Sequence, residues 1–127
     1  MKKLLALYSI LVGAAMIAMW CVFYALNAIP EVIDKPWEIA MHLAAELTTA
    51  ALLIFSGLGL LARAGWAMRV NLFATGMLVY TLIQSPGYYL ERHGLAFVAM
   101  FALCFAATLV LSPAFKPQPR TPSVRPE

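Results

Sequence analysis

The run from Leu4 to Ile29 contains no charged residue, and this most constrains the fold of the chain. A bilayer core takes about 20 apolar residues per helix, with a range of roughly 17–25. The run is therefore long enough to cross a membrane, and three further apolar runs follow it. The four predicted spans cover residues 4–29, 37–61, 70–85 and 95–112. We therefore predict an all-α integral membrane protein, a bundle of four transmembrane helices.

Composition agrees with a membrane protein. Of the 127 residues, 63% are hydrophobic and 12% are charged, whereas soluble domains carry about 25% charged residues. No long basic block suggests nucleic acid as a partner, so the expected partner is the lipid bilayer. Residues 1–112 form the predicted transmembrane domain. Residues 113–127 hold five of the eight prolines, and we interpret them as a disordered cytoplasmic tail.

The distribution of basic residues predicts the orientation of the four spans. Seven of the nine Lys and Arg residues fall on one side, and two fall on the other. The first group is Lys2, Lys3, Arg63, Arg69, Lys116, Arg120 and Arg125, and the second is Lys35 and Arg92. Basic residues are enriched in cytoplasmic loops. Both termini are therefore predicted to be cytoplasmic, and we expect a prokaryotic cytoplasmic membrane.

The N-terminus has a second interpretation. Lys2 and Lys3 followed by an apolar run also resemble the start of a secretory signal peptide. The run is longer than the apolar region of such a peptide, and no small-x-small cleavage site ends it. We therefore favour an uncleaved first span.

The second span contains an ionisable pair, His42 and Glu46. At 1.5 Å per residue, Glu46 lies about 14 Å along the helix from Trp37, close to the middle of a core of about 30 Å. Ionisable residues at such depth are costly and by default mark a functional site. Burial and ionic pairing act on the pKa values of the two groups in opposite directions, so their protonation states stay open. We assign them a role in proton transfer.

Other polar residues gather towards the outer ends of the spans. We interpret them as an outward-opening vestibule above Glu46, although tyrosines at this level also occur in the aromatic belt of membrane proteins. The candidate ligand-binding residues are Tyr24, Asn27, Glu38, Tyr80 and Gln84. The inner half is poorer in polar residues, which argues against a continuous pore.

The sequence identifies no cofactor and no metal site. Its acidic residues and histidines match no specific metal-ligand spacing. A haem held by His42 and His93 is disfavoured, because only one histidine lies within a span. A metal bound through loop and helix residues would need ligands that the spacing does not bring together.

Two families share general features with the chain. The size and four-span plan resemble those of small multidrug transporters, but their intramembrane glutamate lies in the first span, which is uncharged here. The His/Glu pair is similar to that of sterol-isomerase-like membrane proteins, through two residues of one helix. Neither resemblance transfers a functional motif.

Three functions are therefore compatible with the sequence. The first is a pocket for an amphipathic or lipid-like ligand, with His42 and Glu46 as hydrogen-bonding or proton-transfer groups. The second is a proton-coupled small transporter that uses Glu46 and forms homo-oligomers. The third is an accessory subunit of a larger membrane complex. Whether the protein is an enzyme is left open.

Overall fold

The computed structural model describes residues 2–91 and 93–112. Within this part of the chain the protein is helical and contains no strand, which confirms the all-helical prediction. The helices are α1 (Lys2–Ala25), α2 (Glu31–Asp34), α3 (Pro36–Leu61), α4 (Ala67–Glu91) and α5 (Leu95–Leu111). The predicted tail of residues 113–127 lies outside the described residues.

Two of the described helices, α1 and α3, are long and apolar enough to cross a membrane. Helix α5 is apolar but shorter, with 17 residues. Helix α4 contains the predicted span 70–85 and extends beyond it at both ends. We had placed a connector from Pro86 onward, whereas α4 continues through Pro86 to Glu91. Proline lacks the N–H that would bond the Leu82 carbonyl, but it does not end this helix.

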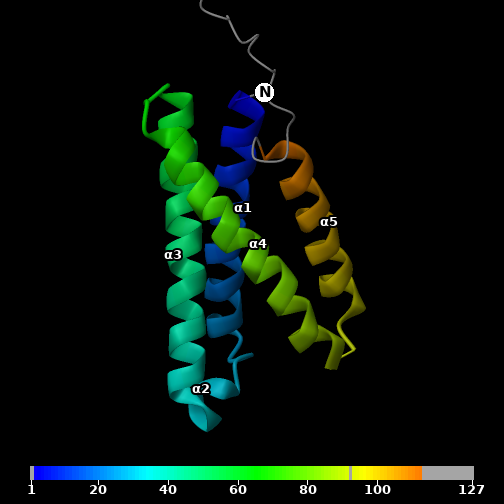
Figure 1. Cartoon of the computed structure of the whole chain (residues 1–127). Helices are drawn as coiled ribbons and strands as arrows, with labels where there is room; N and C mark the ends of the chain where they lie inside the picture. The colour runs from blue at the N-terminus through cyan, green and yellow to red at the C-terminus, as the bar shows by residue number, and fades with distance from the viewer. Residues whose placement is uncertain (1, 92, 113–127) are drawn as a thin grey trace, which may run out of the picture.

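Helices α1 and α3 pack side by side (Figure 1). Their close approach depends on two glycines. A Cβ on Gly13 would lie 2.7 Å from the Ala50 carbonyl oxygen, and one on Gly57 would lie 2.7 Å from Ile10 Cγ1. Small residues at helix interfaces let backbones come close in this way.

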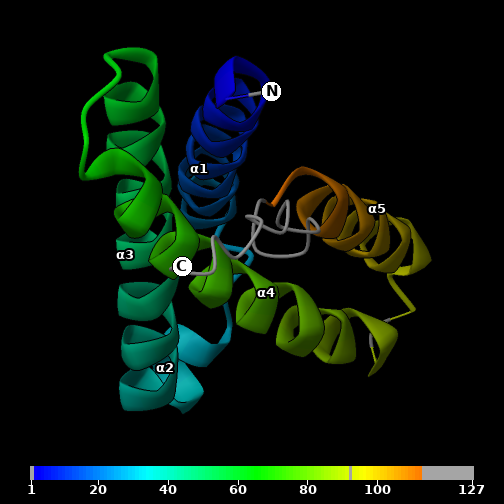
Figure 2. The same ribbon diagram turned by 45° about the horizontal axis from the view of Figure 1, so that its top comes forward.

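Helix α4 does not stay beside α3. It begins next to the end of α3 and then crosses the bundle diagonally, so that the two helices diverge towards α2 (Figure 1). The view in Figure 2 shows the same divergence, with α5 lying beyond α4. The backbones of the first half of α3 and the second half of α4 are therefore farther apart than those of the second half of α3 and the first half of α4.

The apolar core lies where the helices are still close. Its largest cluster includes Leu53 and Leu78, each 1% exposed, together with Met16 and Phe101. A buried polar cluster ties α1, α3 and α4 together nearer the N-terminus. There Asn71 Nδ2 donates to Ser9 Oγ (2.8 Å) and to Ser56 Oγ (3.0 Å).

Three helices end in the same local geometry. Asn27, Arg63 and His93 follow α1, α3 and α4, and each has a positive φ of 50–57°. After α1 the Ala28 N–H bonds the Phe23 carbonyl, and the Asn27 N–H bonds the Tyr24 carbonyl. This is the hydrogen-bond pattern of a Schellman motif, which turns the chain out of a helix. The same pattern follows α3 and α4.

Candidate functional site

Glu46 lies on α3, on the face that meets α1 and α4, and it is 4% exposed. Its Oε2 accepts a hydrogen bond of 2.5 Å from Trp20 Nε1 on α1. Its Oε1 lies 3.2 Å from His42 Nε2 on the same helix and accepts a longer bond of 3.4 Å from Ser85 Oγ on α4. Three helices therefore supply polar partners to one buried carboxyl group.

The pairing of His42 with Glu46 follows from helix geometry, because residues four apart lie on the same face. The side chain of His42 is 35% exposed, whereas that of Glu46 is 5% exposed. The Trp20 ring also meets the His42 ring edge-on, with centroids 6.0 Å apart. The imidazole of His42 is thus the more accessible member of the pair. Trp20 contacts both members.

The polar group faces a cavity of about 800 Å³ between α1, α3, α4 and α5. The cavity lies where α4 diverges from α3, at the end of the bundle that carries α2. Its lining residues from α1 and α3 include Met19, Trp20, Phe23, Ile39, His42 and Glu46, and those from α4 and α5 include Tyr80, Gln84, Ser85, Tyr89, Phe97 and Phe101.

Aromatic side chains form the wall opposite α3. Tyr89 and Phe97 stack with ring centroids 4.5 Å apart. The ring centroids of Phe97 and Phe23, which both line the cavity, are 6.3 Å apart. Offset-stacked and edge-to-face aromatic pairs at these separations are favourable. The cavity therefore combines an aromatic wall with the His42–Glu46 pair on the facing helix.

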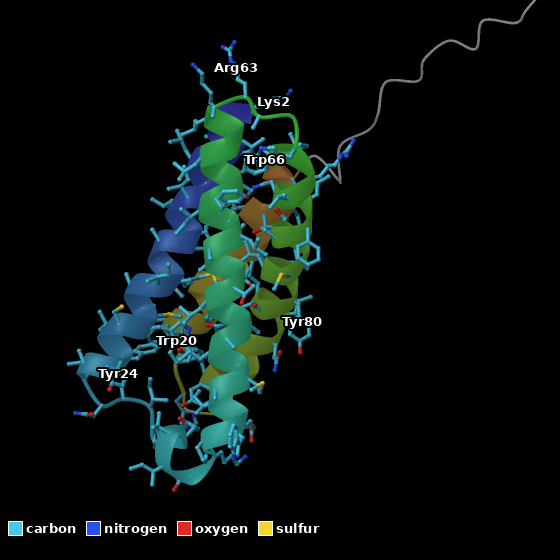
Figure 3. The ribbon with its side chains drawn as sticks, turned by 90° about the vertical axis from the view of Figure 1, so that its left-hand side faces the viewer. Lys2, Trp20, Tyr24, Arg63, Trp66 and Tyr80 are labelled. Carbon is cyan, nitrogen blue, oxygen red and sulfur yellow. The ribbon has the colours of Figure 1, made fainter. Side chains whose placement is uncertain are left out.

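Three of the five predicted ligand-binding residues line this cavity: Glu38, Tyr80 and Gln84. Glu38 also lies 3.3 Å from Lys35, and both side chains are well exposed. Tyr80 is 66% exposed and points away from the bundle in Figure 3. Glu38, Tyr80 and Gln84 are all exposed, so they lie at the edge of the cavity rather than in its interior.

The other two predicted residues, Tyr24 and Asn27, are not among the residues that line the cavity. Tyr24 is 77% exposed, and Figure 3 shows it on the opposite side of the bundle from Tyr80. Asn27 has a conformational role instead. It adopts the left-handed backbone that ends α1, and asparagine tolerates this region better than most residues.

Trp20 and Ser85 are the site residues that the sequence analysis missed. A tryptophan inside an apolar run carries an indole N–H that needs an acceptor when it is buried. Glu46 is the one carboxylate deep within the predicted spans, so this requirement was a usable signal. Ser85 gave no comparable signal, because we had placed it at the end of a span.

Within residues 2–91 and 93–112, no group of three or more His, Cys, Asp and Glu residues is arranged to hold a metal ion. His93 does not line the cavity that His42 faces. His42 and Glu46 are close enough to share a hydrogen bond and to exchange a proton.

Residues 1–120 match the model of a protein family described as a domain of unknown function, DUF8058. The chain belongs to this family. No curated protein and no solved structure matches it. The DUF8058 match covers every residue of the site described above, including Trp20, His42, Glu46 and Ser85.

Proposed function

We propose that this protein is a four-span integral membrane protein that binds an amphipathic, lipid-like ligand in the cavity beside Glu46. The observation that carries the proposal is a buried, three-helix polar group opening onto a large cavity with aromatic and aliphatic walls. Ligand pockets typically combine apolar walls with a few placed polar groups. The ligand's polar end would meet His42 and Glu46, and its apolar part would contact the aromatic wall.

The outer surface supports the membrane part of the proposal. Large apolar side chains are exposed on several helices, including Leu11 (70%), Phe73 (64%), Leu103 (73%) and Val110 (72%). Water-soluble monomers rarely expose extensive apolar patches. Lys2 and Arg63 lie at the same end of the bundle (Figure 3). This position agrees with a cytoplasmic end that gathers basic residues, and we propose both termini there.

Proton transfer is part of the proposal. His42 and Glu46 are within hydrogen-bonding distance, and His42 is the more accessible of the two. A proton can therefore pass between the buried carboxyl group and a ligand by way of the imidazole. Trp20 and Ser85 can donate hydrogen bonds to Glu46 but take no proton from it at ordinary pH.

Proton-coupled transport by Glu46 is the second candidate. It needs access from both faces of the membrane, and the buried side chains of Leu53 and Leu78 lie between the cavity and the Asn71 cluster. Transport would thus require a second conformation. A role as an accessory subunit, with the exposed apolar faces covered by another membrane protein, is the third candidate.

Mass spectrometry of the protein purified in mild detergent tests the first proposal. We expect an amphiphile to co-purify with the wild-type protein and to be depleted several-fold in Glu46→Gln. Asp34→Asn is the matched control, because it also neutralises a carboxylate but at an exposed position on α2, outside the cavity. Equal retention in both variants, or no amphiphile on the wild type, would contradict the proposal.

A further inference from the structure

A second hollow lies on the other side of the His42–Glu46 pair. It is a groove of about 460 Å³ between α3 and α4. On α4 the groove extends from Leu72 to Gln84, a length of about 18 Å at 1.5 Å per residue. Its lining residues on α4 include Leu72, Phe73, Gly76, Met77, Tyr80 and Gln84.

The groove is open to the outside of the bundle and is mainly apolar. Phe73 is 64% exposed and Leu72 is 37% exposed. At Gly76 an added Cβ would have no atom within 4 Å, so the helix surface is open there. In a membrane-spanning bundle, such an apolar and open face contacts the hydrocarbon chains of lipids.

The groove and the cavity share five lining residues: His42, Ala45, Glu46, Tyr80 and Gln84. These side chains therefore belong both to the wall of the groove and to the wall of the cavity, so the two hollows adjoin at this level. Ala45 presents little bulk, and Tyr80 and Gln84 are exposed side chains. Figures 1 and 2 show that α4 diverges from α3 towards this end of the bundle.

We infer that the α3–α4 groove is a lateral entrance through which a lipophilic molecule dissolved in the bilayer reaches the cavity beside Glu46. The inference rests on the proposed function. It depends on the continuity of the groove with the cavity through the five shared residues, and on the apolar lining of the groove. It also specifies the source of the ligand, which is the membrane interior and not the aqueous phase.

A second copy of the chain is the main alternative occupant of the groove. Seated on Phe73 and Gly76, it would cover the entrance instead of leaving it open. The two occupants differ in one measurable respect. An entrance controls the rate at which ligand arrives, whereas an interface between copies controls the oligomeric state.

Fluorescence of Trp20 provides the test, because Trp20 lines the cavity and bonds Glu46. In a background with Trp37→Phe and Trp66→Phe, Trp20 is the sole tryptophan. The protein is reconstituted into phosphatidylcholine vesicles, and dibromostearate is added as a quenching amphiphile. The rate of quenching measures arrival of the probe, and its final extent measures occupancy.

The two variants to compare are Gly76→Phe and Gly87→Phe. Both glycines lie on α4, and at both an added Cβ meets no atom within 4 Å. Gly76 lines the groove, whereas Gly87 lines neither hollow. Both substitutions replace a poor helix former, so neither should disrupt the helix. We expect Gly76→Phe to slow quenching about tenfold relative to Gly87→Phe, with the same final extent.

The other outcomes overturn the inference in different ways. Equal quenching rates in the two variants show that the probe enters elsewhere, while the proposed function stands. A smaller final extent without slower quenching makes the groove part of the binding site and not its entrance. If Gly76→Phe abolishes an oligomer that the wild-type protein forms and leaves the quenching rate unchanged, the groove is an interface with a second copy of the chain. If Trp20 is not quenched in the tryptophan-reduced parent, the proposed function fails together with the entrance.

Discussion

The indole of Trp20 donates a 2.5 Å hydrogen bond to Glu46 across the interface between α1 and α3. The same indole meets the imidazole of His42 edge-on. Trp20 therefore fixes the orientation of both ionisable residues from a neighbouring helix. His42 and Glu46 lie on one helix, but because Trp20 contacts both of them, the geometry of the site also depends on how α1 packs against α3.

We predict that Trp20→Phe lowers the stability of the folded protein by about 1–3 kcal/mol, since it leaves a buried carboxyl oxygen without its donor. Phenylalanine keeps an aromatic ring but lacks the N–H and part of the indole surface, so the loss combines the hydrogen bond with some packing. Thermal unfolding in detergent measures the change. Trp37→Phe is the control, because Trp37 is 80% exposed. An equal effect in both variants would show that the bond to Glu46 contributes nothing specific.

The close packing of α1 and α3 gives a second prediction. Gly13→Ala should destabilise the protein by about 1–3 kcal/mol, as expected when extra atoms enter a tight interface. Its Cβ would lie 2.7 Å from the Ala50 carbonyl oxygen and 2.8 Å from Ile54 Cγ1. At Gly65 an added Cβ meets no atom within 4 Å. Gly65→Ala should therefore leave the unfolding temperature unchanged or raise it, and a loss equal to that of Gly13→Ala would refute the steric argument.

The turn after α3 gives a third prediction. Arg63 has a φ of 57°, a conformation that costs an L-residue roughly 1–2 kcal/mol and costs glycine little. Arg63→Gly should therefore raise the unfolding temperature. Arg63→Ala removes the same charge but keeps the strain, so it should give no comparable gain. A similar gain from alanine would assign the effect to charge.

Much of the fold is predictable from the sequence because apolar runs define helices directly. The runs 37–61 and 95–112 correspond closely to α3 and α5. The end of α4 was not predictable in this way. Proline usually marks a helix boundary, but here Ser85, Pro86 and the residues up to Glu91 remain helical.

The site was predictable only in part, for a physical reason. Contacts within one helix follow from residue spacing, so the proximity of His42 to Glu46 could be derived. The contact with Trp20 depends on the rotation of α1 about its axis, and the cavity depends on the diverging path of α4. Neither the rotation of α1 nor the path of α4 can be read from a local sequence pattern. The vestibule therefore included Tyr24 and Asn27, which lie outside the cavity wall.

The topology is a fourth prediction. A reporter active only in the cytoplasm should work when fused after residue 127 and should fail when inserted into the α2 segment, Glu31–Asp34. The reason is the excess of Lys and Arg at the end of the bundle opposite α2. An active α2 insertion would contradict the proposed orientation, and so would an inactive C-terminal fusion.

The final prediction concerns the pair itself. Glu46→Gln keeps the size of the side chain and can still accept a hydrogen bond from Trp20, but it removes the titrating group. We expect a folded, membrane-inserted protein that retains several-fold less of the amphiphile found on the wild type. His42→Ala should impair retention as well. The double variant should be little worse than either single one, because residues that act as a unit are not additive.

Additive losses would instead mean that His42 and Glu46 contact the ligand independently. The contrast between Glu46→Gln and Glu46→Ala separates function from structure. Glu46→Ala leaves the half-buried Trp20 N–H without its acceptor, which costs up to about 1–3 kcal/mol, and it should therefore lower the unfolding temperature. If Glu46→Gln retains the wild-type amount of amphiphile and only Glu46→Ala changes the protein, the carboxyl group serves to join α1 to α3, and proton transfer at this site is excluded.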